Sequence, residues 1–164
     1  MTSRVLVAGI GNIFLGDDGF GPEVIRRAGQ RLVGTGARVQ DYGIRGVHLA
    51  YDLLGDWDAL VLVDALPGRG SPGALHVFEA DHESLISTTV LDAHSMDSAA
   101  VFASLAALGG RPPYTVVVGC EVENVDEGIG LSAAVDGAVD RAIDAVAEVL
   151  TALPAAKEAA DPCA

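Results

Sequence analysis

Three short apolar runs constrain the fold of this chain more than any other feature. The runs are RVLVAGI (residues 4–10), DALVLVDAL (residues 58–66) and YTVVVGC (residues 114–120), and each is continuous and rich in β-branched residues. Strands of this kind are typically buried on both faces, as in the middle of a parallel sheet. Such a sheet needs helices between its strands, because parallel neighbours are joined by crossover connections.

The segments between these runs carry the other elements that such a fold requires. Apolar residues spaced along one face predict helices over residues 19–33, 46–56, 95–108 and 131–153. Two further strands are predicted over residues 37–43 and 74–79, and alternation in the second is typical of an edge strand.

The order β-α-β-α-β-β-α-β-α predicts an α/β fold. We expect a three-layer α/β/α sandwich around a mostly parallel, roughly five-stranded sheet that includes one edge strand. Residues 1–153 are predicted to form a single domain. Residues 154–164 have no apolar period, so a disordered C-terminal tail is expected there.

Composition argues against several classes of partner. The 164 residues include 10 basic and 23 acidic side chains, and the net charge of -13 should repel nucleic acid and anionic lipid. No apolar run could span a bilayer and no secretion signal is recognisable, so we expect a cytoplasmic protein without a membrane partner. Nothing in the sequence demands a dimer, and a monomer is expected. The two cysteines form neither a disulfide framework nor a CxxC metal motif.

Acidic side chains gather where a binding site is expected. In open α/β sheets, sites lie beyond the carboxyl ends of the strands, where the connecting loops meet. The polar residues predicted at this edge are Asn12, Asp17, Asp18, Asp41, Asp64, Asp92, His94, Asp97, Glu121 and Glu123. Carboxylates with one histidine favour a cation and not a phosphate group.

The glycine turn after the first strand, GIGNIFLGDDG, admits two interpretations. A dinucleotide-binding fingerprint would need a third glycine where this chain has Phe14, so Gly9 and Gly11 are expected only to allow a tight turn or close packing.

Either Asp17 or Asp18 could cap the following helix, which would stabilise the protein by about 1 kcal/mol. Capping explains one acid and not two, and we favour a functional role for Asp18.

Asp64 and His94 are the other two candidates. Asp64 ends a buried run. A hydrogen-bonded or capping role is nearly as plausible for it as a role as a ligand. His94 is the only histidine expected at the edge, and His48, His76 and His82 are interpreted as ordinary surface or packing residues. The motifs GxSxG and HExxH are absent, which argues against a typical serine nucleophile and against a helical zinc protease.

Four segments then resemble, in order and spacing, the hydrogenase maturation proteases, which trim the C-terminus of the large-subunit precursor of NiFe hydrogenases. They are GIGNIFLGDDGFG, LVLVDAL, DAHSMD and VVVGCEVENVDEGIGLS, and the resemblance covers roughly residues 5–150. It implies that Asp18, Asp64 and His94 form a metal site and carry catalysis, and that Asp41 and Gly43 bind substrate. Some family members have Glu in place of Asp18, and many have a Gln-Pro or Glu-Pro pair where this chain reads GCEVEN.

The resemblance also implies how such a protein would act. An aspartic-type endopeptidase would cut the large-subunit precursor after nickel insertion, and the Asp/Asp/His set would recognise nickel that arrives with the substrate. The metal could polarise the scissile carbonyl, or it could serve recognition alone while carboxylates act as general bases. Two alternatives stay open: a chaperone that binds the nickel-loaded precursor without cleaving it, and, more distant, a nucleotide-binding enzyme.

Overall fold

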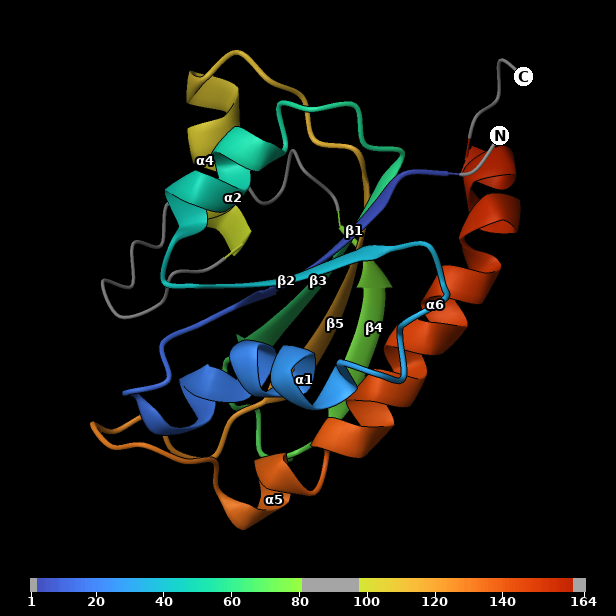
Figure 1. Cartoon of the computed structure of the whole chain (residues 1–164). Helices are drawn as coiled ribbons and strands as arrows, with labels where there is room; N and C mark the ends of the chain where they lie inside the picture. The colour runs from blue at the N-terminus through green and yellow to red at the C-terminus, as the bar shows by residue number, and fades with distance from the viewer. Residues whose placement is uncertain (1–2, 81–97, 161–164) are drawn as a thin grey trace.

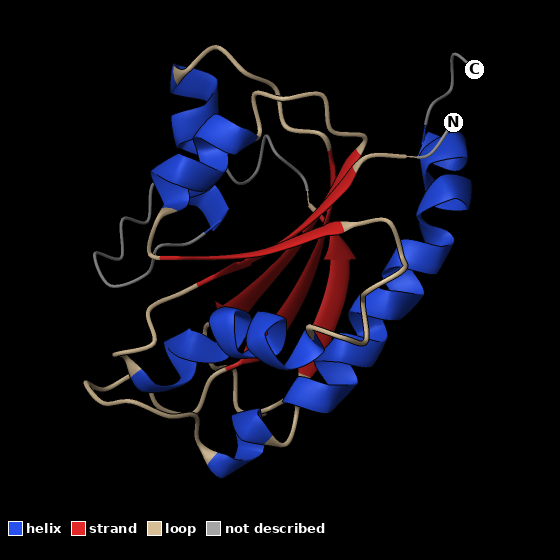
Figure 2. Cartoon of the chain, viewed as in Figure 1, coloured by secondary structure: helices blue, strands red, loops and turns tan. Residues whose placement is uncertain are grey.

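A five-stranded sheet forms the middle of the molecule. The structure, a computed structural model, describes residues 3–80 and 98–160. The strands are β1 (Val5–Ile10), β2 (Arg38–Gly43), β3 (Ala59–Leu66), β4 (Leu75–Glu79) and β5 (Tyr114–Glu121). Their order is β2-β1-β3-β5-β4, with β4 antiparallel at the edge and the other four strands parallel. The predicted mostly parallel sheet with one edge strand is therefore confirmed (Figure 2).

Helices cover both faces of the sheet, as predicted. They are the 3-10 turn η1 (Gly16–Gly19) and the helices α1 (Phe20–Ala28), α2 (Gly46–Asp52), α4 (Ser98–Ala107), α5 (Ala133–Asp136) and α6 (Val139–Ala160). Helices α1 and α6 contact each other on one face, and α2 and α4 contact each other on the opposite face (Figure 1). The result is the three-layer sandwich.

The central strands supply both cores, because successive side chains of a strand point to opposite faces. Val7 and Val61 lie in the core beneath α1 and α6, whereas Leu6, Leu60 and Leu62 lie in the core beneath α2 and α4. All five are fully buried. This explains why the strand sequences are continuously apolar and not alternating.

Three helix boundaries differ from the prediction. Helix α1 ends at Ala28 and is followed by turns, although the apolar pattern extends to residue 33. The predicted helix over residues 46–56 ends at Asp52. The predicted helix over residues 131–153 is two helices: the short α5, which is capped at its start by the Ser132 side chain and ends at Asp136 before Gly137, and α6, which begins at Val139.

The end of the chain also departs from the prediction. Helix α6 continues through Pro154 to Ala160, so the expectation of disorder is wrong for residues 154–160, while residues 161–164 lie outside the described residues. A proline inside a helix costs about 3 kcal/mol relative to alanine. The six residues after this proline, AAKEAA (residues 155–160), are mostly alanine, which has the highest helix propensity.

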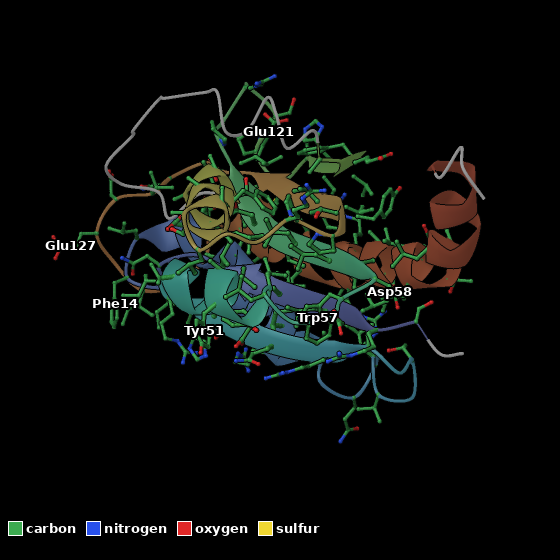
Figure 3. The ribbon with its side chains drawn as sticks, turned by 90° about the horizontal axis from the view of Figure 1, so that it is seen from above. Phe14, Tyr51, Trp57, Asp58, Glu121 and Glu127 are labelled. Carbon is green, nitrogen blue, oxygen red and sulfur yellow. The ribbon has the colours of Figure 1, made fainter. Side chains whose placement is uncertain are left out.

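The parallel strands all end at one edge of the sheet. Ile10, Gly43, Leu66 and Glu121 are the last residues of these strands, so the loops that follow them meet there. Figure 3 separates this end, marked by Phe14 and Glu127, from the opposite end, marked by Trp57 and Asp58. Within the described residues, no helix is both long and apolar enough to cross a bilayer.

Candidate active site

The glycine turn brings η1 and α1 very close to the sheet. A Cβ atom on Gly9 would lie 2.7 Å from the carbonyl oxygen of Gly21, and one on Gly21 would lie 2.3 Å from that of Ile10. Gly11 has a φ of 141°, and its Cβ would lie 2.0 Å from the carbonyl oxygen of Asp18. These approaches confirm that the glycines allow a tight turn and close packing.

Asp18 is nearly buried at this edge and has few partners. It is 7% exposed, and its Oδ2 accepts one hydrogen bond, from the backbone amide of Asn12 at 2.8 Å. No second hydrogen bond to its carboxylate is found within residues 3–80 and 98–160. Burial raises the pKa of Asp18, and the Asn12 amide offsets that rise only in part. The carboxylate therefore has acceptor capacity left for a ligand or a proton.

Asp17 is fully buried and is directed at the segment between β5 and α5, which we call the 122–132 loop. Its Oδ2 accepts hydrogen bonds from the backbone amides of Glu123 at 2.9 Å and Asn124 at 3.0 Å and from the Ser132 hydroxyl at 2.9 Å. Its Oδ1 accepts from the Ser132 amide at 2.6 Å. Burial alone would raise the pKa of Asp17, but these donors together lower it below its ordinary value.

Neither acid caps the following helix, so the capping interpretation is wrong for both Asp17 and Asp18. The N-cap residue of α1 is Gly19, and it makes no side-chain capping hydrogen bond. Because η1 precedes α1 directly, both acids lie in the 3-10 turn and not at the start of the α-helix. Asp17 accepts amide hydrogen bonds from the distant 122–132 loop in place of those from the helix.

Asp64 lies on the strand next to β1, close to the same edge. It is 6% exposed and stands opposite Gly119 in the pairing of β3 with β5. Strand β3 also contacts η1, which contains Asp18. One buried carboxylate, Asp18, therefore follows β1, and the other, Asp64, lies two residues before the end of the adjacent parallel strand β3.

Asp41 and Gly43 lie at the end of β2. The Asp41 side chain is exposed, and its Oδ1 accepts a hydrogen bond from the Gly43 amide at 2.8 Å. The carbonyl oxygen of Gly43 accepts a hydrogen bond from Gly11 at 2.9 Å, which joins this turn to the glycine turn after β1. Both residues thus lie at the predicted edge, and their role in binding substrate stays a prediction.

His94, with Asp92 and Asp97, lies outside the described residues, so the predicted Asp/Asp/His set stays a prediction. In the part of the chain that the structure describes, no group of three or more His, Cys, Asp or Glu side chains could hold a metal ion. What the described residues contribute to that set is the pair Asp18 and Asp64.

A polar pair on β4 and β5 was missed by sequence reasoning. Nε2 of His76 lies 2.7 Å from Oε2 of Glu121, whose Oε1 accepts from the Arg69 amide at 2.8 Å. The hydrogen bond from His76, followed by that from Arg69, lowers the pKa of Glu121. The pair borders a hollow of about 320 Å³ beside Phe78. The antiparallel pairing of β4 with β5 brings the two residues together. In the sequence, only the alternating pattern of the edge strand pointed to this pairing.

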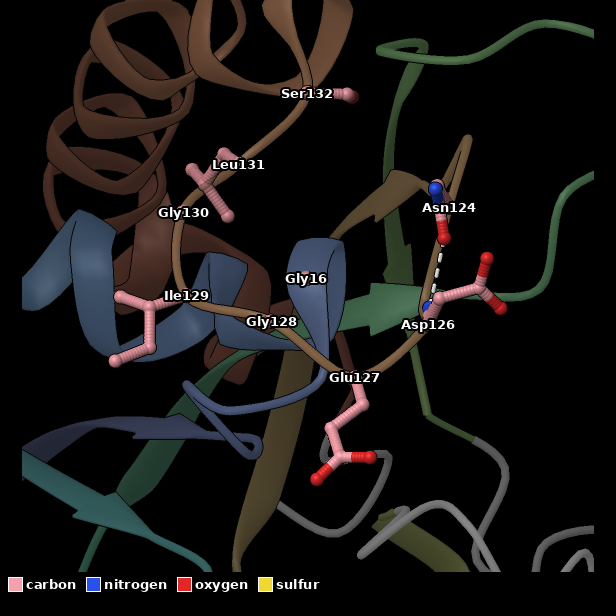
Figure 4. A pocket seen from close by; sticks show the side chains of 9 residues that line it. All are labelled: Gly16, Asn124, Asp126, Glu127, Gly128, Ile129, Gly130, Leu131 and Ser132. Atoms are coloured by element: carbon pink, nitrogen blue, oxygen red, sulfur yellow. Dashed lines mark hydrogen bonds between the residues drawn. The ribbon is translucent and has the colours of Figure 1, made fainter.

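A second hollow, of about 260 Å³, lies along the 122–132 loop next to Gly16 of η1 (Figure 4). Asn124, Asp126 and Glu127 contribute its polar rim, and Ile129 and Leu131 its apolar part. The hollow therefore borders the turn that contains Asp17 and Asp18.

Comparison with known proteins gives a consistent picture. A family model described as hydrogenase maturation protease matches residues 23–149. The hydrogenase 2 maturation protease of Escherichia coli is 27% identical over 135 residues, which cover 81% of this chain and 82% of that protein. The hydrogenase expression/formation protein HupD of Rhodobacter capsulatus is 32% identical over 137 residues, covering 82% of this chain and 65% of HupD. The solved structure of the hydrogenase maturating endopeptidase HybD from Escherichia coli superposes with a TM-score of 0.74, at 27% identity, over 89% of this chain and 91% of that one.

Proposed function

The chain belongs to the hydrogenase maturation protease family, and we propose that it removes the C-terminal extension from the large-subunit precursor of a NiFe hydrogenase after nickel has been inserted. The expected partner is that precursor. Family membership supports a processing endopeptidase, and the geometry of the edge supports the residues that we assign to the reaction.

The observation that carries the proposal is the state of Asp18. Its carboxylate is buried, has a raised pKa and accepts a single hydrogen bond among the described residues. Burying an ionisable group with so little compensation costs stability, and such arrangements cluster at functional sites. A group of this kind can bind a cation or exchange a proton with a substrate.

We assign recognition of the nickel in the precursor to Asp18, Asp64 and His94. Two carboxylate oxygens and one imidazole nitrogen suit a divalent transition metal and leave coordination positions for the precursor's own ligands. When bound, the nickel would hold the precursor at the edge and polarise a nearby carbonyl. An unloaded precursor offers no such link, which would restrict cleavage to the nickel-loaded form.

The chemistry that we assign to the chain's own residues is general acid–base catalysis. One of the two carboxylates accepts a proton from a water molecule while the oxygen of that water attacks the scissile carbonyl carbon. The same proton then passes to the amine that leaves when the C–N bond breaks. The turn of Asp41 and Gly43 is assigned to binding the precursor, because it joins the glycine turn through the hydrogen bond from Gly11.

The test compares nickel-loaded and nickel-free precursor incubated with the protein, with the mass of the large subunit measured by mass spectrometry. Loss of a C-terminal peptide from the loaded form alone is the expected result. Binding without a mass change would replace the protease by the non-cleaving chaperone. Cleavage of both forms equally would refute recognition of nickel.

Two matched variants sharpen this experiment. Asp18→Asn should abolish cleavage, whereas Asp56→Asn should leave it unchanged. Asp56 is exposed and precedes β3 at the opposite end of the sheet, so it controls for the loss of one negative charge. Full activity of Asp18→Asn would contradict the assigned role.

A further inference from the structure

Four large apolar side chains are exposed on two loops next to η1: the loop that precedes it in the sequence and the 122–132 loop, which is hydrogen-bonded to it. Ile13 and Phe14, after β1, are 47% and 57% exposed, and Val125 and Ile129, in the 122–132 loop, are 45% and 78% exposed. We call these four residues the apolar ridge. Apolar side chains exposed together mark interaction surfaces more often than scattered ones do.

Backbone hydrogen bonds join the two loops, so the ridge is one surface. The Gly128 amide donates to the carbonyl oxygen of Phe14 at 2.8 Å, and the Gly16 amide donates to that of Gly128 at 2.9 Å. The Asp17 amide also donates to the carbonyl oxygen of Asn124 at 2.9 Å. These bonds place residues next to Ile129 directly against Phe14.

The ridge is built in advance of any binding event. The carboxylate of Asp17 anchors the 122–132 loop at both of its ends through Glu123, Asn124 and Ser132. Gly16 has a φ of 54°, and a Cβ there would lie 2.6 Å from the carbonyl oxygen of Asn124, so η1 and the loop are in close backbone contact. A preformed surface loses less conformational entropy on binding than one that must first become ordered.

The ridge is continuous with the candidate active site. The Phe14 amide donates to Oδ1 of Asn12 at 2.9 Å, and the Asn12 amide donates to Asp18. A partner resting on the ridge therefore lies one turn away from the carboxylate of Asp18.

Charge at the ridge indicates the chemistry of the partner. Asp126 and Glu127 are exposed in the same loop as Val125 and Ile129, where their side chains point away from that of Ile129 (Figure 4), and neither forms an ion pair with any described residue. A complementary surface would present an apolar protrusion with basic side chains around it. The hollow of about 260 Å³ along the 122–132 loop can receive such a protrusion.

We propose that the apolar ridge is the docking surface for the folded large-subunit precursor and that docking there delivers the C-terminal extension to Asp18 and Asp64. This inference rests on the proposed function and names the contact surface of the same partner. It assigns Phe14 and Ile129 to affinity for the precursor and not to the chemical step.

The test is steady-state cleavage of the nickel-loaded precursor by the wild type, by Ile129→Ser and by the double variant Phe14→Ser/Ile129→Ser. The control is Val33→Ser, because Val33 is 76% exposed, almost the same as Ile129, but precedes β2 at the opposite end of the sheet. We expect the KM of the double variant to rise about tenfold or more while kcat stays within about twofold. Val33→Ser should match the wild type, and Ile129→Ser should fall between the two.

Each result separates docking from the reaction. Cleavage by the wild type together with an unchanged KM in the double variant would overturn the docking surface and leave the proposed function intact. An equal rise in KM for Val33→Ser, or a fall in kcat alone, would also overturn it. Failure of the wild type to cleave would overturn the proposed function, and the docking surface with it. Unchanged thermal unfolding of the variants would show that any rise in KM reflects binding.

Discussion

Around Asp17 the protein places three backbone amides and one hydroxyl, whereas around Asp18 it places one amide. Both residues are buried, and they follow one another in η1. Their pKa values are nevertheless displaced in opposite directions: that of Asp17 falls and that of Asp18 rises. The difference arises from the number of hydrogen-bond donors and not from burial, since burial raises the pKa of both.

This contrast distinguishes a structural acid from a candidate functional one. The carboxylate of Asp17 is fully engaged in joining η1 to the 122–132 loop, so it has little capacity left for a ligand. Asp18 keeps such capacity at the edge of the sheet where substrate is expected. A variant at one position should therefore affect stability, and a variant at the other should affect activity.

The largest effect is expected for Asp18→Asn. We expect cleavage of the nickel-loaded precursor to fall about 10³-fold, because asparagine can neither take up a proton nor bind a cation as carboxylate does. The melting temperature should stay the same or rise, since the variant no longer buries an ionised group. Cleavage is measured by mass spectrometry and melting by calorimetry. A clear fall in the melting temperature of Asp18→Asn would show that Asp18, like Asp17, has a structural role.

The converse variant is Asp17→Ala. The free energy of unfolding should fall by about 3 kcal/mol, because several amides lose their acceptor inside the protein. Urea unfolding measures this change, and amide hydrogen exchange at Glu123, Asn124 and Ser132 should become faster. The control, Asp56→Ala, removes an exposed carboxylate and should change the free energy by less than about 0.5 kcal/mol. An equal change in both variants would contradict the structural role of Asp17.

The pH dependence of stability should separate the two acids further. The folded-state pKa of Asp17 lies below the ordinary 3.8, so its contribution is complete above 3.8 and is lost as the pH falls through the folded pKa. The folded-state pKa of Asp18 lies above 3.8, so its ionisation costs stability at neutral pH, and that cost disappears as the pH falls toward 3.8.

Urea unfolding of both Asn variants from roughly pH 7 to pH 3 tests these windows. Asp17→Asn should have a lower free energy of unfolding than the wild type, and this difference should shrink only below pH 3.8. Asp18→Asn should have a higher free energy of unfolding than the wild type, and this difference should shrink as the pH falls toward 3.8. Parallel curves for the two variants would show that the environments of the two acids do not differ as described.

The smallest expected effect belongs to Ser132→Ala. This change removes the hydroxyl that donates to Asp17 and that caps α5 through the Val135 amide, but it keeps the Ser132 amide. The free energy of unfolding should fall by about 1 kcal/mol. Thr151→Ala removes an exposed hydroxyl bonded to a helix carbonyl and should change stability by less than about 0.5 kcal/mol. A loss as large as that of Asp17→Ala would show that the hydroxyl, and not the amides, dominates the anchor.

Much of the fold could be predicted because it depends on local patterns. The central strands are continuously apolar since residues such as Leu60 and Val61 pack against opposite helical layers, and that pattern is visible in any short window. The position of Asp18 and Asp64 at one edge followed from the rule that parallel strands end together. Helix ends were less predictable, because the apolar period continues past Ala28 and across residues 131–153, while the turns after α1 and the Ser132 cap of α5 are formed by single hydrogen bonds that the period does not reveal.

The sequence by itself determined the order of the elements, the layered sheet and the strand ends at which acidic side chains collect. Only the tertiary structure decided which acid is hydrogen-bonded to the 122–132 loop and which keeps acceptor capacity. The donors to Asp17 lie 106 to 115 residues further along the chain, and His76 meets Glu121 across 45 residues. Hydrophobic periodicity is a property of neighbouring residues, whereas the hydrogen bonds and burial of a carboxylate depend on which distant segments the fold brings beside it.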